Sequence, residues 1–423
     1  MWVAAVCGWA GHAAAAEPSL FVTIVMHSEQ NARYDLNPLL FEQNRTNLYQ
    51  FAGMLARHGV QFDFQSDWTF LAGTINFDTG GRAETGGTNI VAWMERDLGF
   101  AIDPHNHVNQ SAYTYADVAE LIRRCGATPT AIAGGFIALP VTNSEWELFQ
   151  QPIAGGVYTD ATWTAGALWG GGSGNHTLDT NTWFSGVYCP RDGTNMWQHQ
   201  DGNLPDIGGF GGRHQIWTNL DMLLAWRDAG LLCTGSLYTC NLMVNMSSLD
   251  PSFTAAFDAQ LQLYTNVPAI EWVNLVQLTN IWATAYERRP SRRPWMTTND
   301  LDADGMIDGW EVTNFCGTCE SDGGADGDTD GWSDREEFVA DTQPTNAASA
   351  FSSDWNYEDP NVPVVGIPDS SPDRRYRIER ATNLLYGAWR PVITNIPGNG
   401  GLLQLTFTNR PDTAFYRTGV TRP

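Results

Sequence analysis

The sequence predicts an α/β fold: a (β/α) barrel of seven or eight units, then an acidic linker and a small C-terminal β-sandwich. Three observations support this prediction. Apolar, β-branched runs alternate with helical patterns over residues 17–290. Polar residues gather where those runs end, which is where the functional face of a barrel lies. Carboxylates concentrate between residues 300 and 341, where fourteen of them accompany a single base, Arg335.

The first strand and the first helix are the clearest elements. Residues 20–29 form a near-continuous apolar run, as expected for a strand buried on both faces of a parallel sheet. Residues 37–58 show helical apolar spacing, and Gly59 fits a C-cap. Further strands are expected at 60–68, 100–107, 131–138 and 237–244, further helices at 88–98, 115–124, 219–229 and 251–264, and a last strand–helix pair at 269–287. A loop is expected after Trp68, and the loop-rich segment 140–218 leaves the strand count open.

Composition and hydropathy argue against a nucleic-acid partner and against a transmembrane segment. The 423-residue chain has a formal charge of −24, and its 23 basic residues are all arginine. Such an acidic protein is unsuited to nucleic acid, because phosphate binding needs a basic surface. No run after residue 16 is long and apolar enough to cross a membrane. The sequence therefore predicts neither a nucleic-acid partner nor a transmembrane segment.

Residues 1–16 are small and apolar and end in an Ala-x-Ala site before Glu17, which predicts a secretory signal peptide. The usual basic start is missing, so the signal is expected to be truncated or misassigned. Export removes Cys7 and leaves six cysteines, an even number that permits disulfides. The first pairs to test are Cys233–Cys240 and Cys316–Cys319. The predicted location is extracellular, or on the surface of a bacterium.

Two acidic loops within residues 295–345 carry the most specific motif of the chain. In each loop, acids occupy positions 1, 3, 5, 9 and 12, and glycine occupies position 6. This is the pattern of the EF-hand calcium loop, in which position 7 contributes its backbone carbonyl. The expected Ca²⁺ ligands are Asp300, Asp302, Asp304, Met306, Asp308 and Glu311, and then Asp326, Asp328, Asp330, Trp332, Asp334 and Glu337. The loops resemble the calcium-binding linkers of secreted bacterial proteins, dockerin-like or thrombospondin type 3-like, which implies that calcium stiffens a connection between modules. The alternative is a disordered acidic spacer.

The C-terminal segment, residues 366–423, shows short strand patterns separated by turns. It predicts a small β domain. Binding to a glycan, attachment to a cell surface and an inert terminal module all remain open for it.

A pair of histidines follows the predicted strand that begins at Phe100. In Asp103-Pro-His105-Asn-His107, two imidazoles lie beside a carboxylate, a combination that can hold a divalent metal such as zinc. His27 and Glu29 occupy the equivalent end of the first strand. The alternative is a pair of polar turns whose histidines hydrogen-bond to the backbone.

Residues 20–289 resemble the polysaccharide deacetylase superfamily, mostly in topology. Met26-His27-Ser28-Glu29 stands where that family carries an aspartate pair. The histidine segment stands where the family carries two histidines, which normally have three residues between them rather than one. The resemblance implies a metal-dependent hydrolase of carbohydrate on a distorted barrel. It implies His105 and His107 as zinc-type ligands, with His27 or Asp103 as a third.

The same resemblance implies catalytic roles for three more residues. Glu29 would be the general base, His176 the acid that protonates the leaving amine, and Asp67 an orienting group. His199 and His214 compete with His176. Four tryptophans expected on loops or strand ends would suit a sugar ring: Trp68, Trp169, Trp183 and Trp197.

Two other functions stay open from the sequence. A barrel glycoside hydrolase would use a carboxylate pair, Glu29 with Asp67 or Asp103, and would need no metal. A non-catalytic glycan-binding surface protein is favoured by the missing aspartate pair and disfavoured by the polar residues at the strand ends.

Overall fold

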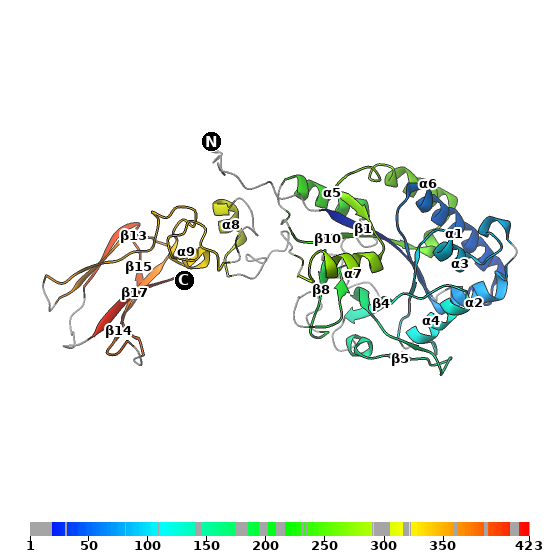
Figure 1. Cartoon of the computed structure of the whole chain (residues 1–423), viewed down its shortest axis with the longest axis horizontal. Helices are drawn as coiled ribbons and strands as arrows, with labels where there is room; N and C mark the ends of the chain where they lie inside the picture. The colour runs from blue at the N-terminus through cyan, green and yellow to red at the C-terminus, as the bar shows by residue number, and fades with distance from the viewer. Residues whose placement is uncertain are drawn as a thin grey trace. The chain divides into compact units, whose positions relative to one another are not determined.

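The structure is a computed structural model of the chain (Figure 1). It describes residues 19–422 except 30–31, 81, 109, 140–144, 174–184, 194–201, 209–215, 230–231, 233–234, 290, 292–304, 316–320, 322, 359–361, 385–387 and 407–413. The chain divides into two compact units, one covering His12–Arg293 and the other including Pro294–Pro423. None of the described helices combines the length and the apolar character needed to cross a bilayer.

A five-stranded parallel sheet lies at the centre of the first unit. Its strands are β1 (Leu20–Ser28), β2 (Asp63–Ser66), β3 (Ala101–Pro104), β10 (Tyr238–Asn245) and β11 (Ile270–Trp272). The order is β10-β1-β2-β3, and β11 pairs with the first residues of β1. Every residue of β1 is buried, as the unbroken apolar run predicts.

A second sheet continues the first beyond β3. Its order is β4-β7-β9-β8, with β4 at Ile132–Leu139, β7 at Ala167–Ser173, β8 at Val187–Tyr188 and β9 at Asp206–Ile207. An isolated parallel bridge, His105 with Gly134, joins the two sheets. On the other side, Asn241 of β10 donates to the carbonyl of Gly208, and Ser185 donates to the carbonyl of Thr239 at 2.8 Å. Side-chain hydrogen bonds thus make this junction. Among the described residues no backbone ladder closes the sheets into a barrel.

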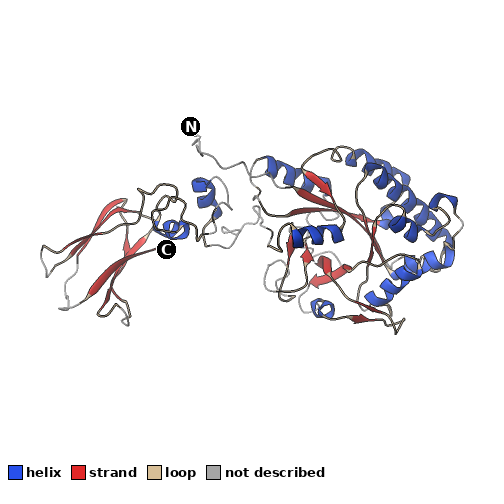
Figure 2. Cartoon of the chain, viewed as in Figure 1, coloured by secondary structure: helices blue, strands red, loops and turns tan. Residues whose placement is uncertain are grey.

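Helices connect the parallel strands in the order expected from the sequence (Figure 2). They are α1 (Pro38–His58), α2 (Trp68–Phe77), α3 (Ile90–Arg96), α4 (Tyr115–Arg124), α5 (Ile216–Asp228), α6 (Pro251–Leu261) and α7 (Leu275–Thr284). Helix α1 begins at the Asn37 cap and ends at Gly59, whose φ of 68° is the left-handed C-cap conformation. Helix α2 replaces the expected loop, because Asp67 caps it and its apolar residues pack inward. A short hairpin, β5 (Ile153–Ala154) with β6 (Thr162–Trp163), lies between β4 and β7.

Helix α7 contributes to the core between the two sheets. Its Leu275, Leu278 and Trp282 pack in one apolar cluster with Phe21 and Val25 of β1. The carboxylate of Asp63 accepts the Leu275 N–H at the start of α7, at 3.0 Å. A buried carboxylate at a helix N-terminus is favoured by the free backbone donors there.

The predicted Cys233–Cys240 disulfide is wrong, because Cys240 is a free, buried thiol in the middle of β10. Cys125 is also free and buried, Cys189 is buried, and Cys233 lies outside the described residues. Cys316 and Cys319 lie outside the described residues.

The second unit combines two short helices with two antiparallel sheets. The helices are α8 (Asp308–Phe315) and α9 (Asp334–Ala340). The sheets have the orders β12-β13-β16 and β15-β14-β17, with β12 at Asp354–Asn356, β13 at Val364–Ser370, β14 at Arg375–Ala381, β15 at Arg390–Pro397, β16 at Gly401–Thr406 and β17 at Phe415–Thr421. The two sheets share one apolar core that includes Val365, Ile367, Tyr376, Ile378 and Leu405. This is the arrangement of a small β-sandwich.

Candidate metal centres

His27 and His105 come together at the carboxyl ends of β1 and β3. Their ring centroids lie 4.5 Å apart, and the His107 ring lies 4.9 Å from that of His105. Trp169 of β7 packs edge-on against His27 at 5.2 Å. In a parallel sheet all carboxyl ends meet at one edge, so residues almost eighty positions apart become neighbours. The structure therefore brings together three of the four predicted zinc-type ligands.

Three ring nitrogens of this histidine cluster are buried and have no hydrogen-bond partner among the described residues: His27 Nε2, His105 Nδ1 and His105 Nε2. A neutral imidazole has one N–H donor and one acceptor, so His105 leaves both unsatisfied. Burial, followed by the nearby His27 and His107, holds the pKa of His105 well below its ordinary value. His105 is therefore neutral at physiological pH, the form in which an imidazole binds a metal.

The orphaned nitrogens fit a divalent cation, but the described residues do not form a complete ligand set. Leaving a buried polar group unpartnered costs roughly 1–3 kcal/mol, which a bound ion would offset. Within the described part of this unit, no three candidate ligand atoms lie within 4.8 Å of one another. The histidine cluster thus supplies part of a coordination sphere.

Two glycines of β4 make room for the histidine cluster. A Cβ on Gly135 would lie 2.6 Å from His105 Nε2, and a Cβ on Gly134 would lie 2.2 Å from Gln65 Oε1. Gly135 also has a φ of +75°, a left-handed conformation that favours glycine. The sequence offered a signal that was not used: a glycine pair inside an apolar strand indicates a bulge or a close approach.

Glu29 lies beside the histidine cluster, whereas Asp103 is engaged elsewhere. Glu29 Oε1 is 3.9 Å from His27 Nδ1, and its side chain is 21% exposed. Asp103 pairs in register with Gln65 and accepts hydrogen bonds from Gln65 Nε2 at 3.2 Å and Thr130 Oγ1 at 2.5 Å. Burial raises the pKa of Asp103 to about 7, against those two hydrogen bonds. The carboxylate oxygens of Asp103, which were predicted as metal ligands, therefore accept hydrogen bonds inside the sheet.

Asp67 acts as the N-cap of α2. Its carboxylate accepts from Phe70 N at 3.2 Å, from Thr69 Oγ1 at 3.0 Å and from Ser28 Oγ at 3.4 Å. Burial raises its pKa to about 7 although these donors favour the charged form. It thus links the ends of β1 and β2, and its carboxylate is directed to these donors.

Several other predicted residues can be placed or set aside. His176, His199, His214, Trp183 and Trp197 lie outside the described residues. Trp169 was expected to be exposed, but it is 2% exposed and belongs to the core, because β7 is an interior strand. Trp68 is half-buried and stacks on Tyr113, with centroids 4.5 Å apart and ring planes 5° apart.

Sequence reasoning missed Glu145, which binds the segment that carries His107. Its carboxylate accepts from Val108 N at 3.3 Å and Ile137 N at 3.2 Å. Burial raises its pKa to about 7, so it exchanges a proton near neutral pH. No local motif around Glu145 marks it in the sequence.

The second acidic loop forms a compact group of carboxylates in the other unit. Asp326, Asp328 and Asp330 each offer an oxygen, and these oxygens lie within 4.8 Å of one another. Glu337 is buried at the start of α9. Gly331, at position 6, has a φ of +98°, the turn that the motif requires. Of the first loop, Asp300, Asp302 and Asp304 lie outside the described residues, whereas Met306 and Glu311 are fully buried.

The electrostatics of the second loop favour a cation. Burial raises the pKa of Glu337 to about 7, and the charges of Asp328, Asp330 and Asp334 add to that shift. Asp328 Oδ2, Asp330 Oδ2 and Glu337 Oε2 are buried, and within the described part of this unit they have no hydrogen-bond partner. Oxygens left unpaired beside like charges are suitable ligands for a hard cation such as Ca²⁺. Asp334 differs, since it accepts from Ser321 Oγ and from Gly327 N.

No family model matches this chain, and no curated protein does. Among the solved structures that resemble it are two with a TM-score of 0.39 each. One is assigned as a polysaccharide deacetylase from Mycobacterium smegmatis, with 11% identity over 67% of this chain and 95% of that one. The other is a 4-alpha-glucanotransferase from Thermococcus litoralis, with 8% identity over 62% of this chain and 40% of that one. Both neighbours are carbohydrate enzymes, but likeness at this level assigns neither a family nor an activity.

Proposed function

We propose that the first unit is a secreted, metal-dependent hydrolase of carbohydrate, and that it removes acetyl groups as polysaccharide deacetylases do. One observation carries the proposal: His27 and His105 converge at the functional edge of a parallel sheet with three buried, unpartnered ring nitrogens. Buried ring nitrogens without a partner destabilise the fold unless they bind a ligand.

His27 and His105 would hold the metal, with His107 as the next ligand, and zinc is the ion that suits imidazole donors. The ion would polarise an amide or ester carbonyl and lower the pKa of water. The chain itself supplies the proton-transfer groups. Glu29, partly exposed and 3.9 Å from His27, is placed to accept a proton. Glu145, with its pKa near 7, is a candidate proton donor beside the segment of His107.

An aromatic pair supports a sugar substrate. Trp68 is the first residue of α2, just after β2, and it stacks on Tyr113, which precedes α4. Both rings are partly exposed. Flat aromatic surfaces near a polar site are suited to the C–H faces of sugars.

Metal content and acetate release together test this proposal. The wild-type protein should hold about one zinc-type ion per first unit and release acetate from acetylated oligosaccharides. His105→Ala should lose the ion, and acetate release should fall at least about 100-fold, beyond the loss typical of an outer-shell partner. His58→Ala is the matched control, because His58 pairs with Asp258 at 2.5 Å at the end of α1. A wild-type protein without transition metal, or a His105→Ala variant with full activity, would refute the proposal.

A glycoside hydrolase is the second candidate, and it is favoured by two carboxyl groups of different environment at the same edge of the sheet. The pKa of Asp67 is about 7, as a general acid requires, and the nearby Glu29 is more exposed. Release of reducing sugar in the presence of a zinc chelator, without acetate, would select this function.

For the second unit we propose that the acidic loops bind Ca²⁺ and hold α8 and α9 in place. Asp326, Asp328 and Asp330 offer oxygens within 4.8 Å of one another, and Trp310 of α8 packs against Phe338 of α9 with centroids 5.2 Å apart. Chelating calcium should expose residues 305–341 to protease while the first unit remains resistant. Equal cleavage with and without chelator would contradict this role.

A further inference from the structure

A cleft in the second unit lies between α9 and the β14–β17 edge of the sandwich. Its volume is about 980 Å³. Five charged side chains line it: Arg335, Glu336, Arg377, Glu379 and Arg417. Three arginines against two glutamates give the cleft a charge of +1, in a chain whose 23 bases and 47 acids sum to −24. The cleft is therefore an exception to the acidic character of the chain.

The positive charge of the cleft is held in a fixed arrangement. Glu379 lies between two arginines, with Arg417 Nε at 2.8 Å and Arg377 Nε at 3.3 Å. The Arg417 guanidinium also packs over the ring of Trp389, 4.4 Å from its centroid. Both arginines contact Glu379 through Nε, and Arg377 Nη1 also donates to the carbonyl of Val420 at 3.5 Å. The Arg417 side chain is 50% exposed, which leaves its terminal amino groups accessible to a ligand. A guanidinium presented in this way binds a carboxylate or sulfate in two-point fashion.

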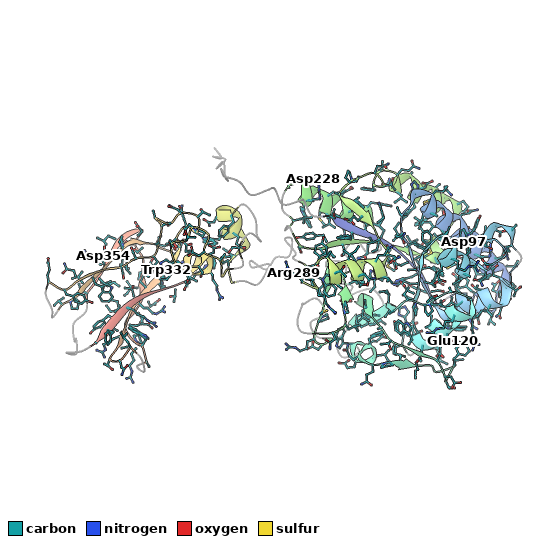
Figure 3. The ribbon with its side chains drawn as sticks, in the orientation of Figure 1. Asp97, Glu120, Asp228, Arg289, Trp332 and Asp354 are labelled. Carbon is teal, nitrogen blue, oxygen red and sulfur yellow. The ribbon has the colours of Figure 1, made fainter. Side chains whose placement is uncertain are left out.

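Two aromatic rings accompany the arginines. Trp332, labelled in Figure 3, meets Phe351 edge-on at 6.0 Å, and both line the cleft. Phe351 in turn stacks on Tyr376 of the sandwich core, with centroids 6.4 Å apart. Aromatic surfaces with a few convergent polar groups are typical of ligand pockets. The remaining acid of the cleft, Glu336, is engaged in the α9 capping box, where its carboxylate accepts hydrogen bonds from Ser333 N and Ser333 Oγ.

We infer that this cleft binds an acidic saccharide, a chain of sugars that bear carboxylate or sulfate groups. Arg377 and Arg417 bind the anionic groups, and Trp332 and Phe351 contact the apolar sugar faces. Charge complementarity selects an anion, and the aromatic rings select a saccharide over an acidic peptide. The second unit then attaches the chain to an acidic glycan, whatever reaction the first unit performs.

Titration calorimetry on the full chain, in calcium-containing buffer, tests this inference with two hexasaccharides. A galacturonate hexamer should bind about tenfold or more tightly than a galactose hexamer, which is a difference of about 1.4 kcal/mol. Arg417→Gln and Arg377→Gln should each weaken galacturonate binding about fivefold or more, and raised salt should weaken it further. Arg390→Gln is the matched control, because Arg390 is exposed on β15 and does not line the cleft.

Three results would overturn the inference: equal binding of the two hexamers, wild-type affinity in both cleft variants, or equally tight binding of a polyglutamate peptide that the same variants abolish. The last result would make the cleft a peptide site. Because the variants lie in the second unit, these outcomes are independent of metal content and acetate release in the first unit.

Discussion

The two candidate metal centres differ in what their ligands do when no ion is bound. His27 and His105 are buried, and their rings pack against Trp169 and against Gly135 of β4. The second acidic loop is half-exposed. Burial raises the pKa of its Glu337, and the like charges of Asp328, Asp330 and Asp334 add to that rise. The first centre is thus held by the packing of neutral neighbours, whereas the second gathers like charges that a bound cation would neutralise.

This difference predicts where each centre is sensitive. A preformed centre should be most sensitive to substitutions that displace the residues packed around it, even where the substituted residue does not itself bind the metal. A centre of mutually repelling ligands should be most sensitive to the ion supply. Variants in each region can separate these two cases.

Gly135→Ala is expected to have the largest effect, about 3 kcal/mol of destabilisation from backbone strain and overpacking together. Its new Cβ would lie 2.6 Å from His105 Nε2, so His105 must move and metal content should fall. Urea unfolding and metal analysis measure both consequences. Gly59→Ala is the control: its φ is +68° with nothing within 4 Å, so strain of about 1–2 kcal/mol should act alone. Equal losses in the two variants would mean that packing does not fix His105.

Glu337→Gln should change the response of the second unit to calcium. At a free calcium level of 100 times Kd, binding stabilises the wild type by about 2.7 kcal/mol, and the variant should lose most of this gain. Without calcium the variant should be at least as stable as the wild type, because the substitution removes one charge facing Asp328 and Asp330. Calorimetry with calcium and with chelator measures the stability of the variant relative to the wild type in both conditions.

Glu336→Gln is the matched control for Glu337→Gln. Glu336 belongs to the α9 capping box, so its loss should cost a similar small amount with and without calcium. A wild-type calcium response in Glu337→Gln would rule out position 12 as a ligand.

The same contrast explains what the sequence could predict. The acidic loop is one contiguous segment with a fixed spacing, so its residues were identifiable from the motif, and Asp326, Asp328 and Asp330 do converge. The strand–helix order was also predictable, and the helix expected at 37–58 is Pro38–His58. Strong periodicity and capping residues specify such elements locally.

The histidine cluster was predictable only in part. Strand ends indicated that His27 and His105 would meet, because parallel strands share one functional edge. The neighbours that hold them come from other strands: Trp169 from β7, and Gly134 and Gly135 from β4. Their positions depend on strand register, which a single sequence does not determine. Asp67 and Asp103 also have the right chemistry, but local donors bind their carboxylates.

Asp117 provides the smallest and most specific test, because it is a buried carboxylate that needs no cation. It accepts from the backbone N–H groups of Thr114, Gly156 and Tyr158 at 2.7–2.8 Å. Burial acts to raise its pKa, but these donors outweigh burial and lower it. Its stabilisation is therefore present above the ordinary pKa of a carboxyl and is lost as pH falls through the lowered value.

Asp117→Asn should cost about 1.5 kcal/mol, the low end for hydrogen bonds to a charged group, since the amide keeps one acceptor oxygen. Urea unfolding at neutral pH should show the same cost with calcium and with chelator. At acidic pH the wild type and the variant should converge, because the wild-type carboxyl becomes protonated. A calcium-dependent cost would mean that buried carboxylates in this chain respond to the ion even where the backbone already satisfies them, and the distinction between the two centres would then fail.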